Sequence, residues 1–81
     1  MIIKFYQKNC VPCGMLENVM KELSLSPDES IEVTPDNIEE IKEKYDIHST
    51  PTLVKLDENG SEMKRLSSVG MSKVSKFFKE R

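Results

Sequence analysis

The 81-residue sequence has no tryptophan, only two cysteines and a single histidine, His48. Its apolar runs are far shorter than the ~20 residues that span a bilayer. Its 12 basic and 14 acidic residues are mixed along the chain, without a basic block of the kind that binds nucleic acid. Met1 leads directly into a strand-like pattern, which leaves no room for a signal peptide. These shortages predict a cytoplasmic protein that binds neither nucleic acid nor membrane.

The chain is short enough that we expect one domain over residues 1–81. Its two cysteines are spaced as Cys10-Val11-Pro12-Cys13, so a bridge between them closes a very small loop. Chain entropy gives such a loop only about 2 kcal/mol of stabilisation. Small secreted scaffolds also use more bridges over longer loops. A structural staple is therefore a poor explanation of this pair.

Hydrophobic patterning predicts the order β-α-β-α-β-β-α. The predicted strands are residues 2–6, 31–34, 52–56 and about 62–67. After Cys13, apolar residues recur at helical spacing and predict a first helix with one buried face. The opposite face of this helix, which includes Glu17, is predicted to point outward. A second helix is predicted to begin at Pro35-Asp36 and a third at Ser72, each with a capping residue.

The connections between these segments predict an α/β fold. A strand–helix–strand opening implies a parallel, right-handed crossover. The Asn59-Gly60 pair predicts a hairpin, which adds antiparallel strands. We therefore expect a four-stranded mixed sheet flanked on both faces by three helices.

The cysteine pair lies between the first predicted strand and the first helix, where reaction sites of α/β sheets collect. Unpaired amide groups at the helix N-terminus favour negative charge, so a thiolate at Cys10 is stabilised. The thiolate is the species that attacks disulfides. Pro12 is tolerated in a first helical turn, where its missing N–H removes no helical bond. Cys13, more enclosed, is placed to resolve the mixed disulfide.

Metal binding is the competing explanation of the pair. A structural zinc site needs about four ligands, and His48 is the one nitrogen donor that the sequence offers. An iron–sulfur cluster bridging two chains needs four thiolates from two copies. Thiol redox chemistry is favoured because a C-x-x-C motif beside a βαβ pattern is its specific signal. We therefore expect neither metal nor bound cofactor.

Several motifs in order resemble the thioredoxin and glutaredoxin superfamily over nearly the whole chain. Cys10-Val11-Pro12-Cys13 resembles its active-site motif, with proline third as in thioredoxins. Residues 44–53, which include Thr50-Pro51, resemble the segment that ends in the cis-proline loop, and Val69-Gly70 resembles the entry to the last helix. The resemblance implies a thioredoxin-like fold and a cis Thr50–Pro51 bond facing the cysteines. Statistics alone favour trans, since cis is about 5–6% of X–Pro bonds.

The resemblance also implies a substrate surface and a set of partners. The implied substrate surface consists of Val11, Pro12, Thr50 and Pro51. The resemblance also implies that the backbone edge at Thr50 pairs with an extended substrate. The implied activity is reduction of protein disulfides by a monomer, in which Cys10 attacks and Cys13 resolves. A thioredoxin reductase is the expected electron source, and glutathione, as in a glutaredoxin, is the alternative. Ribonucleotide reductase is a usual client of small relatives, although no residue here specifies it.

The sequence departs from the family pattern at two positions near the motif. Asn9 stands where thioredoxins place a tryptophan, and Lys4 stands where they bury an acid in the preceding strand. The sequence therefore has a lysine where the resemblance implies the proton acceptor for the resolving thiol. Residues 69–72 hold one glycine and no acid, unlike the glycine pair and acidic residues of glutaredoxins.

Three further residues are weaker candidates. Tyr6 and Lys8 flank the end of the first predicted strand and could line a substrate groove or support a thiolate. His48 precedes Pro51 by three residues, but a solvated loop histidine is the commoner outcome. A binding module with a vestigial motif remains the alternative to an enzyme.

Overall fold

A computed structural model describes residues 1–80, which form a four-stranded sheet and three helices. In chain order the elements are β1 (Ile2–Tyr6), α1 (Val11–Glu22), β2 (Glu29–Glu32), α2 (Ile38–Tyr45), β3 (Thr52–Leu56), β4 (Glu62–Leu66) and α3 (Met71–Lys79). This order confirms the β-α-β-α-β-β-α arrangement predicted from the sequence. None of the helices described is long and apolar enough to cross a membrane.

The sheet is mixed, with strand order β2-β1-β3-β4. β1 pairs parallel with β2, where Lys4 lies opposite Ser30. On its other side β1 pairs antiparallel with β3, where Lys4 lies opposite Leu53. β4 completes the sheet antiparallel to β3. β1 and β3 are therefore the two central strands, and they are the most deeply buried.

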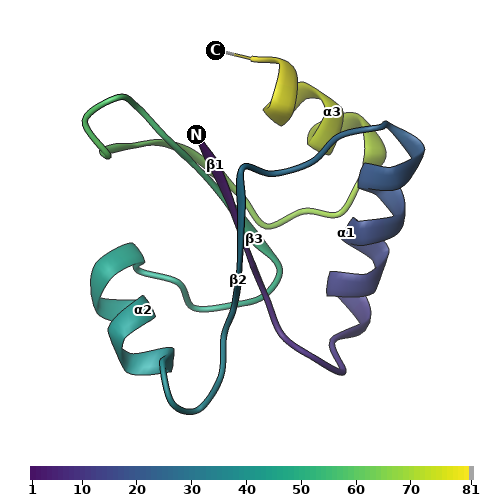
Figure 1. The fold of residues 1–81 in the computed structure, drawn as a ribbon. Coiled ribbons are helices and arrows are strands. Elements are labelled where there is room, and N and C mark those ends of the chain that lie inside the picture. The colour runs from purple at the N-terminus through teal and green to yellow at the C-terminus, as the bar shows by residue number, and fades with distance from the viewer. Residues whose placement is uncertain (81) are drawn as a thin grey trace.

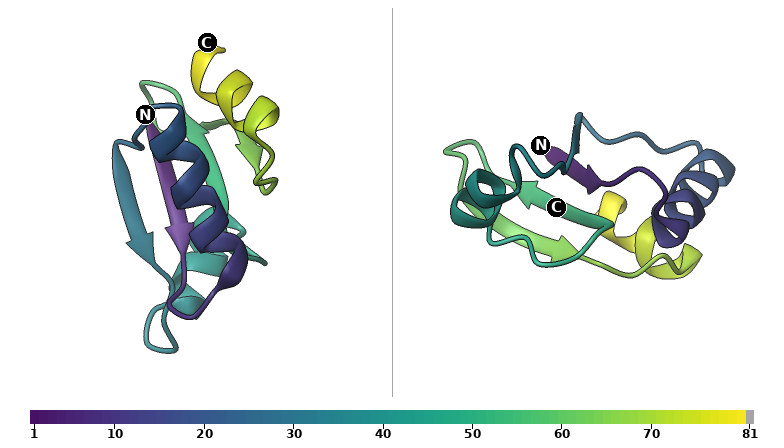
Figure 2. Two further views of the ribbon diagram at one scale, coloured as in Figure 1. Left: turned by 90° about the vertical axis from the view of Figure 1, so that its right-hand side faces the viewer. Right: turned by 90° about the horizontal axis from the view of Figure 1, so that it is seen from below.

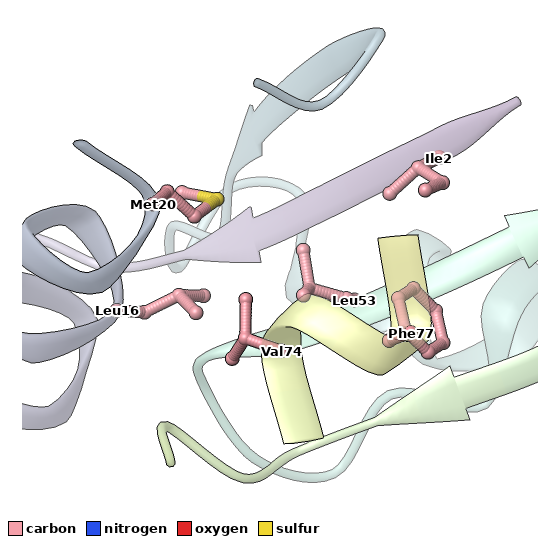
Figure 3. Close-up of a cluster of buried hydrophobic side chains, with 6 residues drawn as sticks. All are labelled: Ile2, Leu16, Met20, Leu53, Val74 and Phe77. Carbon is pink, nitrogen blue, oxygen red and sulfur yellow. The ribbon is translucent and has the colours of Figure 1, made fainter. Parts of the chain in front are cut away.

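The helices cover both faces of the sheet, as predicted (Figure 1). α1 and α3 lie on one face, and Figure 2 shows α1 running along β1. Alternate residues of the strands and the apolar stripes of the two helices form the core between them (Figure 3). This core contains Ile2, Leu16, Met20, Leu53, Val74 and Phe77. Because its members come from four elements, it holds α1 and α3 against the sheet.

α2 covers the opposite face of the sheet (Figure 1). Odd-numbered residues of β1 point to this side, because successive side chains of a strand alternate between faces. Ile3 and Phe5 meet Ile41 of α2 in a second buried cluster. Tyr45 closes the cluster, with its ring centroid 4.9 Å from that of Phe5.

The starts of three elements differ from those predicted, and β2 also ends at Glu32 rather than at residue 34. β2 begins at Glu29 rather than at residue 31. The Asp28 N–H donates a hydrogen bond to the Ile2 carbonyl, so the chain is already paired with the start of β1 before Glu29. α2 begins at Ile38, since the Asn37 side chain binds back to Thr34 and Glu32 instead of leaving Asp36 as the cap.

The start of α3 also differs from the prediction. Gly70 is its N-cap and makes no side-chain capping bond, whereas Ser72 lies within the first turn. The Ser68 hydroxyl instead accepts a hydrogen bond from the Gly70 N–H at 3.2 Å.

Two basic side chains from β3 and β4 bind the carboxyl ends of helices, where unpaired carbonyl groups favour cations. Lys55 is buried and donates hydrogen bonds from Nζ to the carbonyls of Phe77 and Glu80 at the end of α3. Arg65 donates to the carbonyls of Tyr45 and Asp46 at the end of α2, at 2.8 and 2.9 Å. The sheet thus fixes both helices through charge as well as through apolar packing.

The core position of Leu53 gives a stability prediction. Leu53 is fully buried on central strand β3, so Leu53→Ala should lower the free energy of unfolding by about 2–5 kcal/mol. Met63 on β4 is 50% exposed, and Met63→Ala should change it by no more than about 0.5 kcal/mol. Urea unfolding followed by circular dichroism measures both. Equal effects of the two substitutions would contradict this description of the core.

Candidate active site

The connection from β1 to α1 brings Cys10 and Cys13 together. Asn9 has a left-handed φ of 56°, a conformation that asparagine tolerates well, and it directs the chain into the helix. Cys10 follows as the N-cap of α1 in an extended conformation, and Cys13 lies in the first turn. Their Cα atoms are 5.2 Å apart and their sulfur atoms form a disulfide.

The two sulfur atoms occupy different environments. Cys10 is partly exposed, whereas Cys13 is 6% exposed. The backbone N–H of Cys13 donates to Cys10 Sγ at 3.2 Å, as it would to the oxygen of an ordinary capping residue. This donor and the helix dipole both favour negative charge on Cys10 Sγ. Pro12 lies in the same first turn, where it removes no helical hydrogen bond.

Thr50 lies across from Cys10 at the end of the loop that precedes β3. Its Oγ1 is 3.7 Å and its carbonyl oxygen 3.9 Å from Cys10 Sγ. The Thr50 hydroxyl donates to Gln7 Oε1 at 2.8 Å, which ties this loop to the segment that precedes the cysteines. The Thr50–Pro51 peptide bond is cis and Pro51 is buried. The structure therefore brings together the cysteine motif and the loop that the sequence singled out.

The exposed surface at the start of α1, directly after Cys10, is apolar. Val11 is 77% exposed directly after Cys10, and Pro12 is also exposed. One helical turn further on, Met15 is exposed as well. Exposed apolar side chains beside a reactive sulfur are a suitable surface for a protein substrate.

The inner side of the site contains a charged pair that the sequence did not predict. Lys4 is only 8% exposed, and its ammonium group forms an ion pair with Glu17 of α1. The sequence pattern predicted that Glu17 points outward; its side chain is indeed 46% exposed, but its enclosed Oε1 turns back toward β1 to meet Lys4. Burial lowers the pKa of Lys4 from its usual value. The Lys4 ammonium also lies 5.0 Å from the centre of the Tyr6 ring.

An open depression of about 540 Å³ joins this pair to the cysteines. Its lining residues come from β1, α1, β2 and the connection between β1 and α1. They are Lys4, Tyr6, Gln7, Asn9, Cys10, Cys13, Gly14, Glu17 and Ser30. Tyr6 thus lines a groove beside the cysteines.

The other weak candidates lie at the surface. His48 is exposed, and its Nε2 is 2.6 Å from Asp46 Oδ1. Lys8 is exposed too. Within residues 1–80, no three His, Cys, Asp or Glu side chains converge in the way that a mononuclear metal site requires.

A disulfide with one sulfur partly exposed at a helix N-terminus and the other buried behind it defines a thiol–disulfide oxidoreductase. The thioredoxin family model matches residues 1–80, and the chain therefore belongs to the thioredoxin family. This match and the observed sheet and helices confirm the resemblance found in the sequence.

Solved thioredoxins have the same fold. A reduced thioredoxin pre-protein of Schistosoma mansoni is 28% identical with a TM-score of 0.70, over 96% of this chain and 74% of that one. The oxidised thioredoxin of Plasmodium falciparum is 27% identical with a TM-score of 0.63, over 94% and 74%. The germline-specific thioredoxin Deadhead of Drosophila melanogaster is 24% identical with a TM-score of 0.69, over 95% and 75%. None of the curated protein sequences compared with this chain matches it.

The unequal exposure of the two sulfur atoms predicts the order of alkylation. In the reduced protein, iodoacetamide should modify Cys10 before Cys13, because Cys10 is both more accessible and at the helix N-terminus. Peptide mass spectrometry after short exposure at neutral pH identifies the modified residue. Initial modification at Cys13 would contradict the assignment of the two sulfurs.

Proposed function

We propose that the protein reduces disulfide bonds of other proteins, with Cys10 as the nucleophile and Cys13 as the resolving thiol. The Cys10 thiolate attacks one sulfur of the substrate disulfide, and the other substrate sulfur leaves as a thiolate. Cys13 then loses its proton and attacks Cys10 Sγ, which releases the second substrate sulfur. The substrate gains two electrons, and the Cys10–Cys13 pair gives up two and becomes a disulfide.

The observation that carries this proposal is the difference between the two sulfur environments. An incoming disulfide reaches the partly exposed Cys10, while Cys13 is 6% exposed and lies one helical turn behind it. The Cys13 N–H that meets Cys10 Sγ is a ready donor to a thiolate. The 5.2 Å separation of the Cα atoms allows Cys13 to close the disulfide within the same chain.

We propose that substrates dock on the exposed Val11 and Pro12 and the partly exposed Thr50, with the buried Pro51 shaping the backbone of Thr50 from beneath. Val11 and Pro12 offer exposed apolar contact directly beside Cys10. The backbone of Thr50 reaches within 3.9 Å of Cys10 Sγ, so an extended peptide that pairs with this edge passes over the sulfur.

We propose a thioredoxin reductase as the electron donor, and a cytoplasmic location because a recycled dithiol needs a reducing compartment. A glutathione site needs groups that bind its two carboxylates. The start of α3 offers one glycine, Gly70, as an N-cap without a side-chain bond. Lys8 is exposed, and one exposed lysine adds little binding energy.

The choice of donor gives a direct kinetic prediction. NADPH with thioredoxin reductase should recycle the Cys10–Cys13 disulfide faster than millimolar glutathione with glutathione reductase does. NADPH oxidation coupled to insulin reduction measures both rates in one assay. Efficient turnover with glutathione and none with thioredoxin reductase would contradict the proposed donor and show that the protein is glutathione-dependent, as glutaredoxins are.

The docking surface is tested by placing a charge on it. Val11→Asp should raise the KM for a protein disulfide substrate about tenfold, since the carboxylate resists desolvation against an apolar partner. Met63→Asp is the matched control, because Met63 is similarly exposed but lies on β4, outside the site. If Val11→Asp leaves KM at the value of the control, this surface does not bind the substrate.

A further inference from the structure

The pair of Lys4 and Glu17 lies where the fold has little reason to place charges. Lys4 is in the middle of central strand β1 and on the same face as the apolar core under α1. Lysines are almost never buried without a partner, because their charge loses its hydration. Here Glu17 is that partner, and the carboxylate oxygen that meets Lys4 Nζ, Oε1, is itself enclosed.

Glu17 and the buried Cys13 also lie on the same face of α1. Glu17 follows Cys13 by four residues on α1, and residues at this spacing lie on one face of a helix with Cβ atoms about 5–6 Å apart. Both side chains line the depression that also contains Lys4. The Glu17 side chain is nevertheless 46% exposed, so its second oxygen has access to water. The carboxylate thus connects the interior around Cys13 to the solvent.

The chemistry at Cys13 requires such a connection. Cys13 attacks only as a thiolate, so its thiol must first lose a proton. At 6% exposure it cannot give that proton directly to bulk water, and burial disfavours an isolated thiolate. A carboxylate within reach, directly or through one water, can accept the proton.

We propose that Glu17 accepts the proton of Cys13 during resolution, and that Lys4 is the positioning residue that holds Glu17 in place. This inference rests on the proposed disulfide reduction. The proton passes from Cys13 Sγ to the Glu17 carboxylate, and the resulting thiolate forms the bond to Cys10 Sγ. The bond between Cys10 and the substrate breaks, the substrate leaves as a thiolate, and Glu17 returns the proton to it or to water.

Lys4 keeps the charge of the interior balanced through this step. Before the transfer its ammonium faces the Glu17 carboxylate, and afterwards it faces a neutral acid and a nearby thiolate. The titratable side chains around the depression are Lys4 and Tyr6 from β1 and Cys10, Cys13 and Glu17 from the cysteine segment and α1. β2 contributes the uncharged Ser30. No second cation lines this depression among the residues described, so Lys4 is the group that offsets the thiolate.

The test separates the two steps of the reaction. Reduced protein is mixed with 5,5′-dithiobis(2-nitrobenzoate) in a stopped-flow spectrometer. Attack by Cys10 releases the first thionitrobenzoate at a rate that depends on reagent concentration, and attack by Cys13 releases the second at a rate that does not. The inference predicts that Glu17→Gln slows the second phase about 100-fold at neutral pH and leaves the first unchanged.

Three further variants keep the result interpretable. Glu22→Gln, at the exposed end of α1, is the control and should alter neither phase. In Lys4→Met, the pH at which the rate of the second phase is half-maximal should rise, since no ammonium then offsets the thiolate. The double variant of Lys4→Met with Glu17→Gln contains no unpaired buried charge, and its second phase should remain slow.

Several outcomes would overturn the inference. An unchanged second phase in Glu17→Gln, or equal slowing of both phases, removes Glu17 as the proton acceptor. Recovery of the normal second phase in the double variant shows that Glu17 only neutralises Lys4. An unchanged pH midpoint in Lys4→Met removes Lys4 from the mechanism. If the first phase is missing in the unaltered protein, the proposed function fails and this inference fails with it.

Discussion

The packing of α1 along β1 is the contact on which both the fold and the site depend. Ile2 of β1 belongs to the same buried core as Leu16 and Met20 of α1, and this shared core fixes where the helix begins relative to the end of the strand. Cys10 is therefore held at the carboxyl end of β1 with its sulfur at the helix N-terminus. The same contact buries Cys13 and places it one turn behind Cys10.

This packing also explains why a buried charge is tolerated. Lys4 points to the face of β1 that α1 covers, so its ammonium group needs a partner from that helix. Glu17 provides it from a position one turn beyond Cys13. Removing one member of a buried pair is strongly destabilising, whereas replacing both by apolar groups is often neutral. Stability alone therefore does not demand an ion pair at this place, and its position beside the resolving cysteine suggests a role in the reaction.

Much of the fold could be predicted because local patterns and global packing agree. The period-2 and helical patterns located β1, α1 and β3, and the C-x-x-C spacing identified the reactive pair. The predicted start of β2 was wrong because a contact between distant residues sets it, the bonds between Asp28 and Ile2. The predicted starts of α2 and α3 were wrong because Asn37 and Ser68 bind backbone groups two to five residues away, in place of the expected caps.

The charged pair at the site was missed for a similar reason. A glutamate on the polar side of a helical pattern normally faces water. What turns Glu17 inward is a lysine thirteen positions earlier, on a different element. A lysine inside an otherwise apolar strand was the one available signal, because such a residue requires an acidic partner from whatever element covers it. The helix that supplies the partner could be identified only once the packing of α1 on β1 was known.

The central claim is that Cys10 and Cys13 form one reversible two-electron couple. The most direct measurement is the fraction of disulfide in the protein equilibrated with graded ratios of reduced and oxidised dithiothreitol, read by mass spectrometry after acid quench and alkylation. The account predicts one transition with the slope of a two-electron couple, about 30 mV per tenfold change in the ratio, and its complete loss in Cys13→Ser. A protein that stays fully oxidised or fully reduced across the range, or that keeps a transition in Cys13→Ser, would contradict it.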